Sequence, residues 1–276
     1  MTRMSTVVIL SALPREIALI QETYPGDVLH EGGLDIMHHQ DGDVHIFSAF
    51  GGMGTTNIAA AAQTLLTVAR YEVGAPADAL IFTGIAGNLN ARLGFGDIAL
   101  AETLVYEDTD TGIIAEDPPY RETFGSTPEL LALAERVARD AGMTFVENNA
   151  SISGASGLMY TPSGIREVPS DRDDHTQNLA AHRYTVGTVA TSNLFSTEPS
   201  VLTRIIDEDH ADAEEMEGAA VSHVCYKNDI SHVIIRSMSN DCGESYEALD
   251  GRENDLNTSA RLAAQVALGV VAELVK

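Results

Sequence analysis

The sequence predicts an α/β fold with three layers, αβα, around a central twisted sheet that is mixed but largely parallel. Strand, small-residue turn and helix alternate through the first hundred residues, a rhythm typical of such a sheet. The segment 79–82 is continuously apolar, as expected of a buried strand. The 276 residues contain no repeat and no clear linker, so we expect a single domain over 1–276.

The expected elements follow one another along the chain. An apolar run at 7–10 leads to Pro14, which suits the first turn of a helix. An alternating strand at 44–48 runs into the glycine-rich turn 51–54, and a helix rich in alanine and leucine follows over about 55–70. The other expected elements are strands at 79–82, 96–100, 184–191 and 233–235, glycine-rich turns at 84–87 and 94–96, and helices at 128–141 and 257–275.

Two polar stretches, 109–126 and 164–183, are expected to be loop insertions. The second holds three aspartates and a histidine between 171 and 175, but their spacing matches no calcium loop, so we expect a solvated segment and no metal. The two cysteines, Cys225 and Cys242, form neither a disulfide framework nor a CxxC pair. Ordinary reduced thiols and no cofactor are therefore expected.

The charge balance limits the class of partner. The chain has 41 acidic and 16 basic residues and a formal net charge of −25, which repels nucleic acid and anionic membranes. We favour a solvated acidic surface over adaptation to high salt or to a cationic partner. No window offers a membrane span, and the short N-terminal apolar run is interrupted by charge too soon for a signal peptide. A cytoplasmic protein is expected.

The segment 212–220 is the most informative part of the chain. It places acidic residues and a methionine against a run of small residues that is typical of a helix start. Further on, the strand pattern at 233–235 gives way to the polar residues 236–241, where we expect a loop. Strand ends of this kind hold the ligand sites of open α/β sheets. Carboxylates, one arginine and an amide together suit a cationic transition state with a polar leaving group.

Seven motifs follow one another along nearly the whole chain: Ser11-Ala12-Leu13-Pro14-Arg15-Glu16, Gly52-Met53-Gly54, Thr83-Gly84-Ile85-Ala86-Gly87, Gly96-Asp97-Ile98, Val186-Gly187 through Phe195, Glu215-Met216-Glu217, and Arg236 to Asn240. Their order resembles that of the nucleoside phosphorylase/nucleosidase superfamily, and most closely the methylthioadenosine/S-adenosylhomocysteine nucleosidases. The resemblance implies a phosphorylase/hydrolase-like fold, a small-molecule purine nucleoside as partner, and a homo-oligomer, dimer or higher.

The resemblance also implies catalytic roles. Glu217 would grip the ribose hydroxyls and stabilise the oxocarbenium-like sugar, and Glu16 would act as general base toward the attacking water. Without the resemblance, Glu16 is better explained as an acid in the first turn of a helix. The leaving-group position, which is aspartate in the nucleosidases, is Asn240 here, with Asp241 next to it. Both are kept as catalytic candidates.

Eight further residues are expected to bind substrate. Phe195 would stack on the purine and Met216 would pack beneath the sugar, although Phe195 is also a normal core residue. Ile85 departs from the small polar residue that is usual in the nucleosidases, and like Met53 it is also explained by packing. The full expected set is Met53, Gly84, Ile85, Phe195, Glu215, Met216, Arg236 and Ser239.

Three functions remain open from the sequence. The first is a purine nucleosidase, an N-glycosyl hydrolase acting on a 5′-modified nucleoside such as methylthioadenosine or S-adenosylhomocysteine, or on a 6-oxopurine nucleoside. In having asparagine at position 240, the chain resembles futalosine hydrolases and some purine nucleoside phosphorylases. This resemblance favours a 6-oxopurine base over adenine. The second is a phosphate-dependent phosphorylase, which the absence of a basic residue in 79–82 disfavours. The third is a non-catalytic nucleoside-binding protein.

Overall fold

The computed structural model describes residues 4–151, 176–245, 247, 249 and 251–276. Within them, ten strands form one mixed sheet. The strands are β1 (Thr6–Ser11), β2 (Asp27–Glu31), β3 (Leu34–Asp41), β4 (Val44–Phe50), β5 (Ala79–Asn88), β6 (Ile98–Tyr106), β7 (Thr144–Phe145), β8 (Arg183–Thr191), β9 (Ala211–Glu215) and β10 (Ser231–Asp241). The α-helices are α1 (Pro14–Thr23), α2 (Thr55–Val73), α3 (Thr111–Ile114), α4 (Pro128–Asp140), α5 (Pro199–Asp209), α6 (Gly218–Asn228) and α8 (Glu253–Leu274).

The sheet combines an open part and a closed part. From β5 it extends outward through β1, β4, β3 and β2. In the other direction β5 pairs with β9, β9 with β8, β8 with β6 and β6 with β10, and β10 pairs with β5 again. These five strands therefore form a closed ring of pairings. Most strand pairs are parallel, so the predicted mixed, largely parallel sheet is confirmed.

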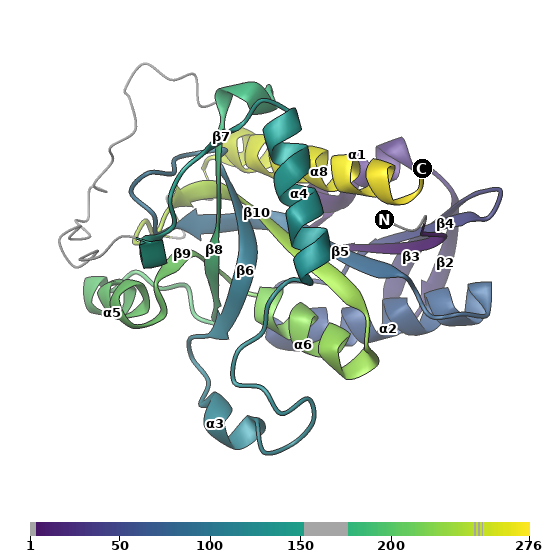
Figure 1. Cartoon of the computed structure of the whole chain (residues 1–276), viewed down its shortest axis with the longest axis horizontal. Helices are drawn as coiled ribbons and strands as arrows, with labels where there is room; N and C mark the ends of the chain where they lie inside the picture. The colour runs from purple at the N-terminus through teal and green to yellow at the C-terminus, as the bar shows by residue number, and fades with distance from the viewer. Residues whose placement is uncertain (1–3, 152–175, 246, 248, 250) are drawn as a thin grey trace.

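Helices cover both faces of the sheet, as the three-layer prediction requires (Figure 1). One apolar core joins the sheet to α2 and α6, through residues such as Leu65 and Val221. The other joins it to α1, α4 and α8, through Ile17, Leu133 and Val266. The expected helices at 55–70, 128–141 and 257–275 are these packed elements, with ends that differ by a few residues. None of the helices in the described ranges is long and apolar enough to cross a membrane.

Two boundary predictions are wrong. The expected turn at 84–87 is the second half of β5, and the expected loop at 236–241 is the second half of β10. These two halves pair with each other in parallel, Arg236 opposite Gly84 and Asn240 opposite Gly87. Because each segment supplies the other with hydrogen-bond partners, strand geometry persists through glycines and polar residues whose local sequence favours turns.

The two predicted insertions have different outcomes. The stretch 109–126 is an excursion that contains the short helix α3 and returns to the sheet where Phe124 bridges Leu104 of β6. In the second stretch, 164–175 lies outside the described residues, including the aspartates and histidine considered for metal. The remainder, 176–183, contains a 3₁₀ turn at Leu179–Ala181 and leads into β8.

A buried aspartate connects β9 to β8 and to two neighbouring loops. Asp212 of β9 accepts hydrogen bonds from the side chain of Asn90 (2.8 Å) and from the backbone N–H groups of Asn149 (2.9 Å) and Thr188 (3.1 Å). Gly187 of β8 lies directly against this carboxylate: a Cβ at position 187 would collide with Oδ2 and approach Cβ of Asn148 to 2.9 Å. Glycine at 187 is therefore required by close approach of β8 and β9.

We predict that Gly187→Ala destabilises the protein by about 1–3 kcal/mol, because the added methyl overpacks the Asp212 network. Urea unfolding followed by circular dichroism measures this free energy. Gly251→Ala is the matched control, since nothing lies within 4 Å of a Cβ at that position, and its effect should be about 0.5 kcal/mol or less. Equal stability of the two variants would contradict the packing argument.

Candidate active site

A cavity of about 230 Å³ opens where the C-terminal ends of β1, β5, β8, β9 and β10 meet. Its wall combines apolar side chains with four glutamates, one arginine and one asparagine. The lining residues are Ala12, Leu13, Arg15, Glu16, Met53, Ile85, Ala86, Gly87, Leu194, Phe195, Ser196, Glu214, Glu215, Met216, Glu217, Ser239, Asn240, Cys242, Gly243, Leu249 and Leu256.

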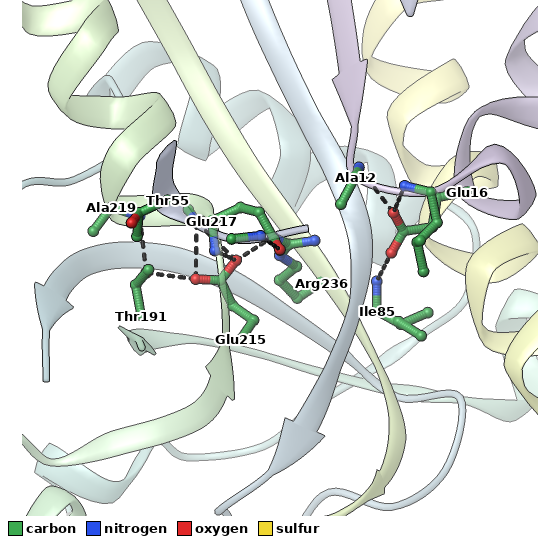
Figure 2. Close-up of polar contacts among 12 residues, drawn as sticks. Ala12, Glu16, Thr55, Ile85, Thr191, Glu215, Glu217, Ala219 and Arg236 are labelled. Carbon is green, nitrogen blue, oxygen red and sulfur yellow. Dashed lines mark hydrogen bonds and ion pairs between the residues drawn. The ribbon is translucent and has the colours of Figure 1, made fainter. Parts of the chain in front are cut away.

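A fully buried arginine organises the carboxylates behind this wall. The Arg236 guanidinium pairs through Nη2 with Oε2 of Glu215 and, at 3.1 Å, with Oε2 of Glu217 (Figure 2). Its Cζ lies 4.3 Å from the centre of the Phe82 ring, a cation–π contact. Gly84 was expected to approach the ligand, but it does not line the cavity. A Cβ at position 84 would collide with Nη1 of Arg236 and with Oε1 of Glu16, so the glycine makes room for both side chains.

Glu217 lies between Arg236 and the glycine turn before α2. Its Oε1 accepts a hydrogen bond from the backbone N–H of Gly54 at 2.9 Å. Gly54 has φ +90°, a conformation that favours glycine and that aims this N–H at the carboxylate. Burial raises the pKa of Glu217 from 4.5 to about 7; the Arg236 charge opposes this shift, and the Glu215 charge adds to it.

Glu16 caps the start of α1 with its carboxylate and also lines the cavity. Oε2 accepts from the backbone N–H groups of Ala12 (2.9 Å) and Leu13 (2.8 Å), so the helix-start interpretation from the sequence holds. Oε1 accepts from the N–H of Ile85 on β5 at 2.9 Å. These bonds use three of roughly four acceptor positions on the carboxylate. Burial raises its pKa, with Arg236 the largest opposing influence.

Glu215 lines the cavity, but its oxygens are engaged inside the protein. They accept from Thr191 Oγ1 (2.5 Å), from the backbone N–H of Gly218 (2.8 Å) at the start of α6, and from Arg236. A carboxylate at a helix N-terminus is favoured by the helix dipole. Glu215 is therefore placed to hold Arg236 and α6, which differs from the substrate contact expected from the sequence.

Asn240 and Asp241 separate at the end of β10. Asn240 is buried and lines the cavity, with Oδ1 accepting from Ser239 Oγ at 2.9 Å and Nδ2 donating to a backbone oxygen at 3.0 Å. Asp241 is not a lining residue; its Oδ1 accepts from Asn88 Nδ2 at 3.2 Å. β10 continues through both residues. A bulge between Met238 and Asn240 shifts the pairing register with β5, and beyond it Asp241 is still paired opposite Asn88.

The remaining expected residues lie in the wall or at the mouth of the cavity. Met216 and Ile85 form part of the wall, and Met53 and Phe195 are 47% and 42% exposed at its mouth. Exposure of a large aromatic and a methionine beside a cavity favours ligand contact over core packing. Within the described ranges, no group of three histidine, cysteine, aspartate or glutamate side chains is arranged to hold a metal ion.

Sequence analysis missed three polar residues of the wall, Ser196, Glu214 and Cys242. Glu214 is 8% exposed, and burial raises its pKa from 4.5 to about 7. Hydrogen bonds from the Ser196 hydroxyl and the Cys242 thiol oppose this shift, and burial is the main reason that the pKa of the thiol is also raised. Strand alternation in 211–215 would have separated Glu214 from Glu215, but the segment was interpreted as the approach to a helix.

The raised pKa of Glu214 predicts a pH dependence of stability. Between pH 4.5 and about 7 the folded protein holds a proton that the unfolded chain releases, so the free energy of unfolding falls as pH rises through this window. Glu214→Gln lacks this contribution. The loss of stability between pH 5 and pH 8 should therefore be smaller in the variant by about 2–3 kcal/mol.

Urea unfolding at a series of pH values measures this difference. Glu273→Gln is the control: the hydrogen bond from Lys276 lowers the pKa of Glu273, so its contribution is lost only as pH falls, below the measured range. Parallel pH curves for the wild-type protein and Glu214→Gln would show that Glu214 is ionised normally and would contradict the prediction.

Sequence comparison places this geometry in a family. A model of the phosphorylase superfamily matches residues 6–276. The 5′-methylthioadenosine/S-adenosylhomocysteine nucleosidase of Treponema pallidum (strain Nichols) is 29% identical over 270 residues, covering 98% of this chain and 93% of the relative. The nucleosidase of the same name from Colwellia psychrerythraea is 26% identical over 278 residues, covering 96% of this chain and 95% of the relative.

Solved structures share the fold over the whole chain. Futalosine hydrolase of Helicobacter pylori strain 26695 superposes with a TM-score of 0.73 at 22% identity, covering 98% of this chain and 99% of that one. The 5′-methylthioadenosine/S-adenosylhomocysteine nucleosidase of Helicobacter pylori, solved with butyl-thio-DADMe-Immucillin-A, gives 0.72 at 22% identity, with the same coverage. From the family match over 6–276, this protein belongs to the phosphorylase superfamily.

Proposed function

We propose that this protein is a purine nucleosidase, which hydrolyses the N-glycosidic bond of a purine nucleoside to free base and sugar. The observation that carries the proposal is the convergence of Glu16 and Glu217 on one cavity. They reach it from segments that are far apart in the sequence, and the charge of Arg236 acts on both. Two buried carboxylates and an amide donor meet the needs of a cationic sugar and an anionic leaving group.

Glu217 is assigned to the sugar. As the bond between C1′ and N9 breaks, its electron pair moves to the purine and positive charge develops on the ribose. A carboxylate close to the ribose hydroxyls stabilises that charge, and it does so more strongly in a buried site than in water. The bonds from Gly54 and Arg236 fix the carboxylate in place before the reaction, so little reorganisation is required.

Glu16 is assigned to water. Its remaining acceptor position suits the O–H of an attacking water, and its raised pKa makes the carboxylate a stronger proton acceptor than an exposed glutamate. The water oxygen forms the new bond to C1′ while its proton passes to Glu16. The three backbone hydrogen bonds hold the carboxylate still during this transfer.

Asn240 is assigned to the leaving base. Its amide N–H can stabilise charge at purine N7 by a hydrogen bond, and the departing anion then takes its proton from solvent. An amide donor of this kind transfers no proton itself, which suits 6-oxopurines because their bases leave more readily as anions. Asp241, with its carboxylate held by Asn88 outside the cavity wall, is not assigned a role in this step.

Water is favoured over phosphate as nucleophile by the charge of the cavity. The wall carries Arg15 against four glutamates, and Arg236 behind it is already paired with two of those carboxylates. A phosphate dianion would enter a site with excess negative charge and one free guanidinium, which is a poor match for its charge and geometry. Among the relatives, the nucleosidases of Treponema pallidum and Colwellia psychrerythraea support the same choice.

The nucleoside itself is proposed as a class. The relatives are named for 5′-methylthioadenosine, S-adenosylhomocysteine and futalosine, and all three names denote 5′-modified nucleosides. The open mouth beside Met53 and Phe195 gives room for a 5′ substituent to extend toward solvent. The substrate is therefore a purine nucleoside with a tolerated 5′ extension, and Asn240 favours a 6-oxopurine base.

A nucleoside panel assayed for released sugar, with and without phosphate, tests the reaction type. We expect release at equal rates in both conditions. Glu217→Gln should lower kcat/KM on the order of 10²–10⁴-fold, because the amide loses the charge that stabilises the sugar cation. Glu208→Gln, on the exposed face of α5, is the control and should change little. Release only with phosphate would establish a phosphorylase, and no release at all would leave a nucleoside-binding protein.

The assignment of Asn240 predicts a change of base preference. Asn240→Asp introduces a group that can protonate N7, so 6-aminopurine nucleosides should gain relative to 6-oxopurine nucleosides by about tenfold or more in kcat/KM. Initial rates on matched adenosine and inosine derivatives measure the ratio. Asp241→Asn is the control, because its carboxylate is held outside the cavity. An unchanged ratio in Asn240→Asp would remove Asn240 from the base site.

A further inference from the structure

Arg15 lies in the cavity wall without a role in the proposed reaction. It is the second residue of α1, one position before Glu16. The two side chains have different environments, because Glu16 is buried and accepts backbone hydrogen bonds, whereas Arg15 is partly exposed. A cation so close to the reacting carboxylate is a candidate for contact with the substrate.

The guanidinium of Arg15 has no partner within the described part of the chain. Its Nη1 is buried and makes no hydrogen bond, and the side chain joins no ion pair or ring contact there. Other arginines do find partners among the 41 acidic residues, such as Arg204 with Glu107 at 2.9 Å and Arg261 with Glu22 at 3.8 Å. A buried donor without an acceptor is unfavourable. Arg15 is therefore suited to an acceptor that a ligand brings.

The proposed mechanism leaves one part of the nucleoside for Arg15. The base has Asn240 as its partner, the ribose hydroxyls have Glu217 and the attacking water has Glu16, and all three residues line the cavity. The 5′ substituent has no polar partner among them. Arg15 lies on α1, which packs against α8, and Leu256 of α8 lines the same cavity (Figure 1). This side of the wall is therefore available to a 5′ extension that leads toward solvent.

We propose that Arg15 binds a carboxylate carried by the 5′ substituent, so that the substrate is a purine nucleoside with an anionic 5′ extension. A guanidinium presents parallel N–H donors that match the two oxygens of a carboxylate. One carboxylate also carries a single negative charge, which one arginine can balance. The inference rests on the proposed function, because it takes the ligand to be a nucleoside held by Glu217 and Asn240.

The charge of the protein makes a free cation important for such a substrate. A chain with a formal net charge of −25 repels anions. The guanidinium of Arg236 is already paired with Glu215 and Glu217, so among the lining residues Arg15 is the cation left for a ligand. Loss of Arg15 should therefore turn a carboxylated nucleoside into a poorer substrate than a neutral one of the same size.

Two nucleosides that share a base and differ only in the 5′ group test the inference. One carries a 5′-butylthio group, and the other carries a 5′-carboxypropylthio group, in which a carboxylate replaces the terminal methyl. The measured quantity is kcat/KM of the carboxylated nucleoside divided by that of the neutral one. Arg15→Gln should lower this ratio about 10- to 100-fold, the effect of losing a hydrogen bond between charged groups. Arg15→Lys keeps the charge and should retain part of the preference.

Arg139→Gln is the matched control, the same substitution at an exposed position of α4, and should leave the ratio unchanged. Thermal melts establish that each variant is folded; if Arg15→Gln is not, Arg15→Lys gives the same comparison with a smaller expected change. Added inorganic phosphate separates an attached anion from a free one. Phosphate that accelerates cleavage of the neutral nucleoside by the wild-type protein and not by Arg15→Gln would place a free anion at Arg15 and overturn the inference.

The failure of this inference and the failure of the proposed function give different results. Cleavage of both nucleosides with the same ratio in the wild-type protein and in Arg15→Gln would refute the anion site and leave the nucleosidase standing. If the wild-type protein cleaves neither nucleoside, the nucleosidase is refuted, and Kd values from titration calorimetry supply the ratio instead. Equal losses of affinity for the two nucleosides in Arg15→Gln, or no binding of either by the wild-type protein, would then overturn the inference as well.

Discussion

The geometry of the site depends on one buried cation, the guanidinium of Arg236. It has no exposed surface and lies on the face of the Phe82 ring. A charge in such a place is tolerated only with paired and hydrogen-bonded partners. Glu215 and Glu217 supply them from the end of β9 and the start of α6. Removing one partner from a pair of this kind typically costs about 3–5 kcal/mol, so the arginine fixes where both carboxylates stand.

The same cation divides two neighbouring glutamates into different tasks. The buried Glu215 carboxylate accepts hydrogen bonds from Thr191, from the N-terminus of α6 and from Arg236, so both of its oxygens have partners inside the protein. Glu217 has the Gly54 N–H on one oxygen and Arg236 on the other, and keeps acceptor capacity toward the cavity. Burial raises the pKa of Glu217 to about 7 even though Arg236 lowers it. The result is a carboxylate held firmly but not neutralised by its partner.

Much of the fold was predictable from local patterns, because strand–turn–helix alternation and apolar runs are local properties. The layer arrangement and the helices at 128–141 and 257–275 follow from them. The second halves of β5 and β10 do not, because Gly84 and the polar run from Arg236 become strand only through mutual pairing. The hairpin of β2 and β3 and the helix α5 were likewise not anticipated. The two strands of the hairpin are short and largely polar, and their stability comes from pairing with the rest of the sheet. The helix α5 instead packs Leu202, Ile205 and Ile206 against residues of β8 and β9.

The site was predicted to the extent that a resemblance carried it. Glu16, Glu217 and Asn240 all line the cavity, although nothing local in the sequence links position 16 to position 217. Gly84 does not line the cavity, and it is required because the side chains of Arg236 and Glu16 lie directly against it. Close packing between distant segments leaves no periodic pattern in a sequence, so a reason of this kind emerges only from coordinates.

Glu214 shows what a correct strand assignment adds. Successive residues of a strand point to opposite faces, so Glu214 and Glu215 have different partners although both line the cavity. Glu215 pairs with Arg236, and Glu214 is hydrogen-bonded to the side chains of Ser196 and Cys242. The acidic composition of 211–215 hid the strand, because acidic residues are rare in strands. Two carboxylates in sequence therefore have two environments, one paired with a cation and one hydrogen-bonded to a serine and a cysteine.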